Sequence, residues 1–256
     1  MSEGPNILFF DLETAPILAY TFSLWKPVIG MDQIKEKPRV ICWSARWYGT
    51  KGNSVMFNSE YKSSTYDMLL ELRDMLDHAD VVVGYNSDNF DVPWINEQFL
   101  TNGIELPSPY IQVDLYKLNK KHLRMPSGKL DYMALDLLGQ RKESTGGIRL
   151  WLDWMDTSSP NHKQALKDME RYAKKDTLLL EPLFDYMRPF IRSVNFGLFK
   201  SSEFSCTHCG SENIQARGFS YTQAGKFQRY QCNDCAGWSK DPKRIETTDL
   251  RPMVNN

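Results

Sequence analysis

Two acidic residues, Asp11 and Glu13, directly follow an apolar run in the segment NILFFDLETAP near the start of the chain. Residues two apart in a strand project from one face, so these carboxylates would leave the sheet side by side and repel each other. A solvated turn is the alternative, because turn-forming residues come next. The continuous apolar run favours a central strand buried on both faces, and acids at its end need a counter-charge such as a divalent cation.

Two later segments carry residues that could complete a cation site. Asp91 follows a predicted buried strand and stands at the head of a helix, where capping of that helix is the alternative role. Tyr172 and Asp176 are four residues apart on one face of a predicted helix, where Asp176 could instead pair with a lysine. Carboxylates supply both the oxygen ligands and the negative charge that a hard divalent cation requires, so the three segments could hold a cation together.

Taken in order, the three segments resemble the three motifs of the DEDD (DnaQ-like) exonuclease superfamily, tyrosine subclass. GYNSDNFDVP is similar to the second motif of the proofreading domains of family B DNA polymerases, and SGKLDYMALDLLGQRKE is similar to a segment between their second and third motifs. The stretch from Ala19 to Trp47 resembles small stand-alone exonucleases of bacteriophages. The resemblance covers roughly residues 5 to 190.

This resemblance implies a metal-dependent 3′-to-5′ exonuclease that holds two magnesium or manganese ions. Asp11 would bridge both ions, Glu13 and Asp176 would complete one site, and Asp91 would hold the other ion mostly through water. Tyr172 would orient the attacking water or help to deprotonate it. Orientation is favoured because a free tyrosine titrates near pH 10, unless the metals lower its pKa.

The resemblance also implies substrate contacts. Asn86 and Phe90 would contact the terminal nucleotide, while the backbone near Leu12 and Thr14 would hold the 3′-hydroxyl. Nucleic acid is the expected partner, with DNA favoured over RNA and single-stranded ends favoured over duplex. A replication or repair protein is a further candidate partner, and the oligomeric state is left open.

Strand-like and helix-like segments alternate along the part of the chain that must position these residues. Strands are predicted at 40–49, 54–58 and 81–86, and helices at 65–79, from near Val92 or Pro93, and at 164–181. Residues 19–39 are typical of a long loop, and Pro182 should kink or end the last helix. The order predicts an α/β fold, which the resemblance specifies as a ribonuclease H-like mixed sheet flanked by helices.

Four of the five cysteines form two C-x-x-C pairs with 22 residues between them, namely Cys206, Cys209, Cys232 and Cys235. This spacing predicts one structural zinc ion in a zinc ribbon built around a hairpin at Gly225, and buried thiols or disulfides are the alternative. Zinc would supply most of the folding energy of so small a module, about 10 kcal/mol or more. We expect His208 to be exposed rather than ligating, and Cys42 to be a core thiol.

Basic and aromatic residues are interleaved along the predicted ribbon. They are Arg217, Lys226, Arg229, Lys240, Lys243 and Arg244, with Phe219, Tyr221, Phe227, Tyr230 and Trp238. Such a set could grip a nucleic-acid backbone and stack on bases. Packing on the catalytic domain or on a protein partner is the alternative.

The 256 residues divide into a predicted exonuclease domain at 1–192, a linker at 193–204, and the ribbon with a tail at 205–256. The net charge of −1 argues against binding nucleic acid by bulk electrostatics, although metal-binding acids would mask basic surface in that sum. The absence of a long apolar run and of signal-peptide features predicts a soluble cytoplasmic protein without membrane contact, in the bacterial host cytoplasm if phage-encoded. A catalytically silent nucleic-acid-binding adaptor and an RNA-processing 3′-to-5′ exoribonuclease are the alternative functions.

Overall fold

The computed structural model describes residues 4–142, 146–200, 202–223, 225–248 and 250. The chain forms two compact units, one of Asn6–Phe184 and the other of Asp185–Asn256 with Met1–Pro5. Among the described residues, no helix combines the length and apolar character that crossing a membrane requires.

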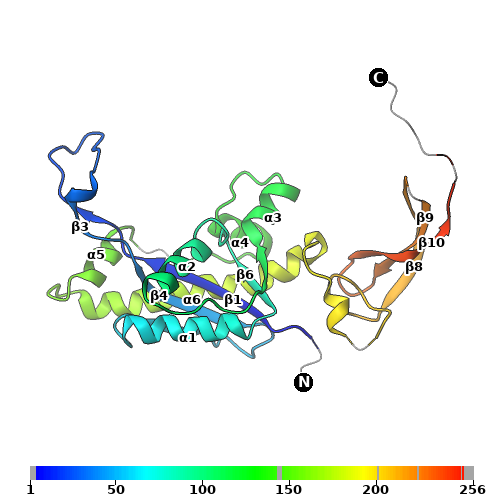
Figure 1. Ribbon diagram of the computed structural model, residues 1–256, viewed down its shortest axis with the longest axis horizontal. Helices are drawn as coiled ribbons and strands as arrows, with labels where there is room; N and C mark the ends of the chain where they lie inside the picture. The colour runs from blue at the N-terminus through cyan, green and yellow to red at the C-terminus, as the bar shows by residue number, and fades with distance from the viewer. Residues whose placement is uncertain (1–3, 143–145, 201, 224, 249, 251–256) are drawn as a thin grey trace. The chain divides into compact units, whose positions relative to one another are not determined.

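A five-stranded mixed sheet forms the centre of the larger unit (Figure 1). Its order is β5-β4-β1-β6-β7, with β1 pairing antiparallel to β4 and parallel to β6. The strands are β1 (Ile7–Thr14), β4 (Val40–Trp47), β5 (Met56–Ser59), β6 (Val81–Gly84) and β7 (Ile111–Asp114). The predicted α/β fold with a mixed sheet is therefore confirmed, and the apolar run before Asp11 lies in the central strand.

Six α-helices accompany the sheet in the described part of the chain. They are α1 (Thr65–Asp77), α2 (Asp91–Thr101), α3 (Leu115–His122), α4 (Leu130–Leu138), α5 (Arg149–Met155) and α6 (His162–Met187). Ser64 caps α1 by accepting a hydrogen bond from the Asp67 backbone N–H at 3.1 Å. The indole of Trp43 on β4 ties the same helix to the sheet by donating to the Met68 carbonyl at 2.8 Å.

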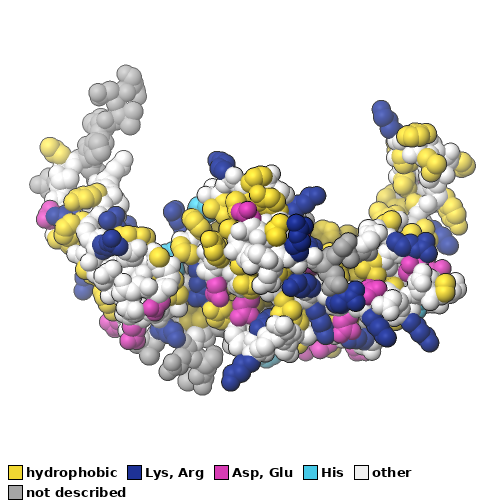
Figure 2. Space-filling model, turned by 180° about the vertical axis from the view of Figure 1, so that it is seen from behind, with side chains coloured by type: hydrophobic (Ala, Val, Ile, Leu, Met, Phe, Trp, Pro, Cys, Tyr) yellow, Lys and Arg dark blue, Asp and Glu magenta, His cyan; other side chains and the backbone are white. Residues whose placement is uncertain are grey.

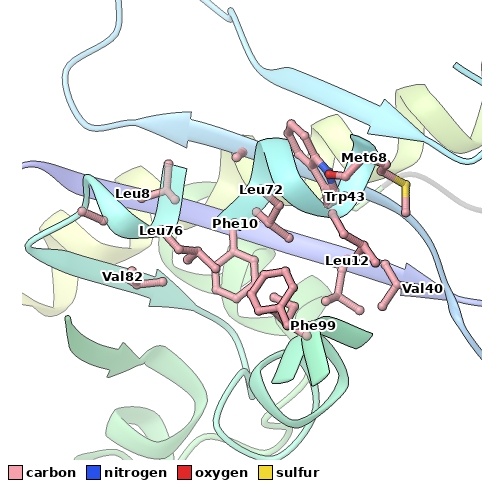
Figure 3. Close-up of a cluster of buried hydrophobic side chains, with 14 of the residues drawn as sticks. Leu8, Phe10, Leu12, Val40, Trp43, Met68, Leu72, Leu76, Val82 and Phe99 are labelled. Carbon is pink, nitrogen blue, oxygen red and sulfur yellow. The ribbon is translucent and has the colours of Figure 1, made fainter. Parts of the chain in front are cut away.

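The alternation of side chains along β1 gives the two faces of the sheet different partners. Leu8, Phe10 and Leu12 belong to a buried cluster with residues of α1 and α2 (Figure 3). Phe9 points to the other face, where its ring lies 5.5 Å from that of Phe184 on α6. Because the side chains alternate with a period of two, Asp11 follows Phe9 on the face that α6 covers.

Helix α6 does not end at Pro182, because it continues to Met187, so the predicted end there was wrong, while a kink at Pro182 stays a prediction. Proline in a helix interior costs about 3 kcal/mol because it lacks an N–H and crowds the preceding turn. Leu183, Phe184 and Met187 follow it and are fully buried. Burial of each such side chain is worth about 1.5 to 3 kcal/mol, so the three together exceed the cost of the proline.

Residues 17–37 form an excursion at the left of Figure 1 that is more ordered than the predicted loop. Strands β2 (Leu18–Ala19) and β3 (Ile34–Glu36) pair antiparallel, and a 3-10 turn, η1 (Met31–Gln33), precedes β3. The segment between the strands carries exposed apolar side chains, including Trp25 at 87% exposure.

The smaller unit contains a three-stranded antiparallel sheet of order β10-β9-β8. Its strands are β8 (Ile214–Thr222), β9 (Gly225–Cys232) and β10 (Trp238–Glu246), and the 3-10 helices η2 (Arg188–Phe190) and η3 (Phe196–Phe199) precede them. Pairing of Thr222 with Gly225 confirms the predicted hairpin.

Candidate active site and metal centre

Three carboxylates from two elements meet at the face of the sheet that α6 covers. Asp11 and Glu13 come from β1, while Asp176 comes from α6, one turn after Tyr172. One oxygen from each carboxylate lies within 4.8 Å of the other two. The structure thus brings together the first and third predicted segments, which are far apart in sequence.

Asp91 reaches this region from the start of α2. It is 3% exposed, and its Oδ1 accepts a hydrogen bond from the Leu12 backbone N–H at 3.2 Å. The capping alternative for Asp91 is therefore wrong, because the N-cap position belongs to Phe90 and no side chain caps the helix there. Asp91 instead ties the head of α2 to β1.

Asp114 holds the loop that precedes Asp91, and the sequence analysis missed this residue. Its Oδ1 accepts from the backbone N–H groups of Asn86 and Tyr116, both at 2.9 Å. Asn86 has a φ of 63°, in the left-handed region that asparagine tolerates better than most residues. The position of Asp114 at the end of a buried parallel strand was the signal that could have indicated its role.

Burial and mutual repulsion raise the carboxyl pKa values throughout the cluster. Burial, followed by the charges of Glu13, Asp91 and Asp176, raises the pKa of Asp11 well above its ordinary value. Burial raises the pKa of Glu13 to about 8 and that of Asp91 to about 7, and it also raises the pKa of Asp176. A cation bound among these carboxyl groups would stabilise their ionised forms, which burial and mutual repulsion disfavour. The cluster therefore favours cation binding once it is ionised.

Two oxygens of the cluster are buried without a hydrogen-bond partner among the described residues. They are Asp11 Oδ2 and Asp176 Oδ1. Buried carboxylate oxygens are normally hydrogen-bonded, so such a pair within one acidic cluster calls for an explanation. Hard divalent cations take oxygen ligands of this kind, and the donor set fits magnesium or manganese.

Lys142 enters the cluster and was not singled out by the sequence analysis. Its Nζ lies 2.5 Å from Asp176 Oδ2 and donates to the Tyr172 hydroxyl at 3.1 Å. The Lys142 backbone N–H donates to Asp131 Oδ1 at 2.9 Å, and this bond fixes the backbone of Lys142 beside α4. A lysine partner for Asp176 was expected only as a solvated pair on a helix surface, whereas Asp176 is 1% exposed.

The pKa of Tyr172 is raised by burial and by the charges of Glu13 and Asp176. A phenol that holds its proton this strongly is a poor base near neutral pH. Its hydroxyl, held by Lys142, can instead orient a polar group beside Asp176 by hydrogen bonding.

Two cavities adjoin the carboxylates. One is lined by Asp11, Asn86, Tyr116, Lys129 and Lys142, among others. The second is lined by Glu13, Thr14, Phe90, Ile148 and Trp151, among others. The predicted substrate residues therefore line these cavities, except Leu12, whose side chain is buried in the core and whose N–H is donated to Asp91.

The four paired cysteines form a second cluster, in the smaller unit. All four sulfurs lie within 4.8 Å of one another, and the Cys206–Cys235 and Cys209–Cys232 sulfur distances are both 3.6 Å. Four Zn–S bonds of about 2.3 Å in a tetrahedron place the sulfurs about 3.8 Å apart. The geometry fits a zinc ion and does not fit disulfides, whose sulfurs are about 2.05 Å apart.

His208 is buried at 8% exposure, so the prediction that it is exposed was wrong. Its ring nitrogens lie 3.2 Å from the Arg188 carbonyl and 3.1 Å from the Trp238 carbonyl. Either carbonyl can accept a hydrogen bond from a ring N–H, which a neutral imidazole carries on one nitrogen only, and that bond makes burial of the ring acceptable. Gly237 leaves the necessary room, because a Cβ there would lie 2.6 Å from His208 Cδ2. Cys42 is fully buried, as predicted for a core thiol.

The mixed sheet with carboxylates on its central strand and on a covering helix defines a ribonuclease H-like domain. Residues 8–188 match the family model of the RNase_H superfamily, and the chain belongs to that superfamily. It is 21% identical over 197 residues to a DNA polymerase of Thermococcus litoralis, which covers 68% of this chain and 11% of the polymerase.

A solved structure shows the same fold. The family B DNA polymerase of the archaeon Pyrobaculum calidifontis superposes with a TM-score of 0.51 and 16% identity, over 86% of this chain and 31% of the polymerase. The chain thus spans about a tenth of the first relative and under a third of the second. The predicted ribonuclease H-like fold and the resemblance to a domain of these polymerases are confirmed, while the tyrosine subclass stays a prediction.

The raised carboxyl pKa values predict a stability that falls with rising pH when no magnesium is present. Glu13 and Asp91 hold their protons up to about pH 8 and 7 in the folded chain, against ordinary values of 4.5 and 3.8. The folded state therefore binds more protons than the unfolded state, and stability is lost as these protons leave. We expect a lower melting temperature at pH 8.5 than at pH 6 in magnesium-free buffer without chelator.

Magnesium or manganese should raise the melting temperature more at pH 8.5 than at pH 6, because the cation binds the ionised carboxylates. Glu13→Gln should flatten the magnesium-free profile. A profile that rises between pH 6 and 8.5, and does so equally in the variant, would contradict the electrostatic description of the cluster.

Lys142→Met should destabilise the magnesium-free chain at pH 7.5, because it leaves Asp176 without its paired charge. Breaking a buried ion pair costs about 3 to 5 kcal/mol, reduced here because Lys142 is partly exposed. Thermal melting is the measurement, and Arg141→Met is the control because Arg141 is exposed. Added manganese should narrow the difference, and equal melting of both variants would show that Lys142 does not balance the cluster.

Proposed function

We propose that this protein is a metal-dependent 3′-to-5′ exonuclease that hydrolyses phosphodiester bonds of nucleic acid. The observation that carries the proposal is the cluster of Asp11, Glu13 and Asp176, in which two buried oxygens lack hydrogen-bond partners among the described residues. A module that only binds nucleic acid has no use for buried acids, since they repel phosphate.

Asp11, Glu13 and Asp176 would hold magnesium or manganese, with Asp91 as a ligand of a second ion. When bound, such ions activate water and stabilise the leaving oxygen of an in-line displacement. Tyr172 would position the attacking water through its hydroxyl. Lys142 would hold that hydroxyl and the Asp176 carboxylate in place, since it contacts both.

The cavities beside the carboxylates suit the end of a strand. Phe90 is 39% exposed and its ring centroid lies 6.3 Å from that of Trp94, so it presents an aromatic surface for a terminal base. Asn86 lies in the other cavity with Asp11 and could hydrogen-bond the terminal nucleotide. The backbone near Leu12 and Thr14 would hold the 3′-hydroxyl.

DNA is the favoured substrate, because the two relatives described above are both DNA polymerases. Degradation from the 3′ end rests on the resemblance of the three motifs to polymerase proofreading domains. Single-stranded ends are favoured because a base must leave a duplex to enter a cavity of this kind.

The test uses end-labelled single-stranded DNA, duplex DNA and single-stranded RNA of one sequence, each with magnesium, manganese or EDTA. We expect single-stranded DNA to be shortened fastest with either metal and not at all with EDTA. Faster loss of RNA would reassign the substrate to RNA. Stable substrates under every condition, or equal degradation in EDTA, would refute the proposed function.

A further inference from the structure

One face of the ribbon sheet gathers basic and aromatic side chains. The strand register places Arg229 opposite Lys240, and it places Phe227 opposite Arg244. Directly opposed residues in an antiparallel sheet share a face, and alternate residues of β9 do so as well. The set formed by Arg217, Phe227, Arg229, Gln231, Trp238, Lys240 and Arg244 is called the basic face below.

Arg217 lies two residues after Gln215, which pairs with Gln231, so the alternation of side chains along β8 places it on this face; the β8–β9 register shifts between Ala216 and Phe219. Its guanidinium lies 5.9 Å from the Trp238 ring centroid, and it donates a hydrogen bond to Gln231 Oε1. Gly218 has a φ of 68°, the left-handed conformation that such a bulge requires. Arg217 and Arg229 thus both lie over the Trp238 ring.

The charges of Arg229 and Lys240 are not balanced across the strands. In the part of the ribbon that the structure describes, neither of them is paired in register with an acidic residue. Arg229 and Lys240 oppose each other directly, an arrangement that destabilises a sheet, and both are exposed to solvent. A polyanion bound beside both side chains would offset this repulsion, because each cation would attract it.

The aromatic rings of the face carry cations above them. The Arg229 guanidinium lies 4.4 Å from the Trp238 ring centroid, and Lys240 Nζ lies 4.6 Å from that of Phe227. Trp238 remains 40% exposed. Nucleic-acid bases stack on aromatic rings and on guanidinium planes when they are not paired within a duplex.

The opposite face of the same sheet is already occupied. Tyr230 packs edge-on against Phe204 at 4.8 Å, and Cys232 belongs to the cysteine cluster. Lys226 on that face pairs with Glu246 at 3.0 Å, so its charge is balanced. The contrast separates a side that holds the ribbon together from a side that carries Arg229 and Lys240. Figure 2 shows one side of the chain, where basic and hydrophobic side chains are mixed over the ribbon at the left of the view.

We propose that the basic face binds single-stranded nucleic acid, with Arg229, Lys240 and Arg244 on phosphates and the Trp238–arginine stack against bases. The inference rests on the proposed nuclease function for the identity of the polyanion. The ribbon lies beyond residues 8–188, which match the family model, so this site is an addition to the ribonuclease H-like domain.

The full chain carrying Arg229→Gln and Lys240→Gln tests the proposal. Affinity for a labelled single-stranded oligonucleotide is measured at several salt concentrations, with calcium in place of magnesium to suppress cleavage. Each lost phosphate contact lowers the slope of log affinity against log salt by about 0.7, so the slope should fall by about 1.4. The control carries Lys226→Gln and Lys51→Gln, which remove equal charge elsewhere.

A second variant, Trp238→Leu, should weaken single-strand binding about fivefold or more while leaving the salt slope unchanged. Duplex of the same sequence should be less affected. Equal affinity and slope in the Arg229→Gln/Lys240→Gln chain and its control would overturn the proposal, as would a loss confined to duplex.

Cleavage by the same variants is measured separately in magnesium. An altered slope without cleavage in the unmodified chain would refute the exonuclease function and leave the basic face assigned. Normal cleavage with an unaltered slope would refute the basic face alone.

Discussion

Replacing Asp11 by asparagine is expected to reduce nuclease turnover at least about 1000-fold, since metal stabilisation of transition-state charge is worth several kcal/mol. Asparagine keeps the shape of the side chain but supplies no negative charge to a cation. Asp11 Oδ2 is buried without a partner among the described residues, so the substitution breaks no hydrogen bond of this oxygen.

The same substitution should leave the fold intact and raise the stability of the magnesium-free chain at pH 8. Burial and the charges of three other acids raise the Asp11 pKa, so removing its charge relieves repulsion. Turnover at saturating substrate and the melting temperature are measured together. Asp136→Asn is the control, because Asp136 is an exposed acid on α4. Near-normal turnover in the Asp11 variant would refute metal-ion catalysis at this cluster.

Replacing Cys232 by serine is expected to unfold the ribbon and to lower bound zinc from one ion per chain to none. A structural zinc site contributes about 10 to 16 kcal/mol, far more than a three-stranded sheet of this size gains from its own core. Zinc is measured by elemental analysis, and ribbon order by limited proteolysis within residues 205–246.

Cys42→Ala is the matched control for this prediction, because Cys42 is buried in β4 outside the cysteine cluster. It should keep one zinc ion per chain and a protease-resistant ribbon. A Cys232→Ser chain with an unchanged ribbon, together with no zinc in the unmodified chain, would contradict the zinc assignment.

Strand β1 was predictable because the sequence pattern that indicates it is local. Four consecutive apolar residues before Asp11 need burial on both faces, and the period of two then puts Asp11 and Glu13 on the same side. The cysteine cluster was predictable for a similar reason, since each C-x-x-C pair is a local turn. The structure adds that the two pairs come together.

The errors came from residues whose environment depends on distant contacts. Pro182 lies within α6 because the residues after it are buried. His208 is buried because carbonyl oxygens distant in sequence lie within hydrogen-bond distance of its ring nitrogens. Lys142 follows α4 in a stretch with many basic residues, and nothing local distinguishes it from Arg141. Only the packing of its segment near α6 places its charge beside Asp176.

The polarity of degradation tests the central claim most directly. A single-stranded DNA labelled at its 5′ end is incubated with the protein and magnesium, with its 3′ end either free or blocked by a phosphate. The proposed exonuclease should convert the free substrate into a ladder of progressively shorter labelled products and should leave the blocked one intact. Immediate release of labelled mononucleotide, or equal degradation of both substrates, would contradict a 3′-to-5′ exonuclease.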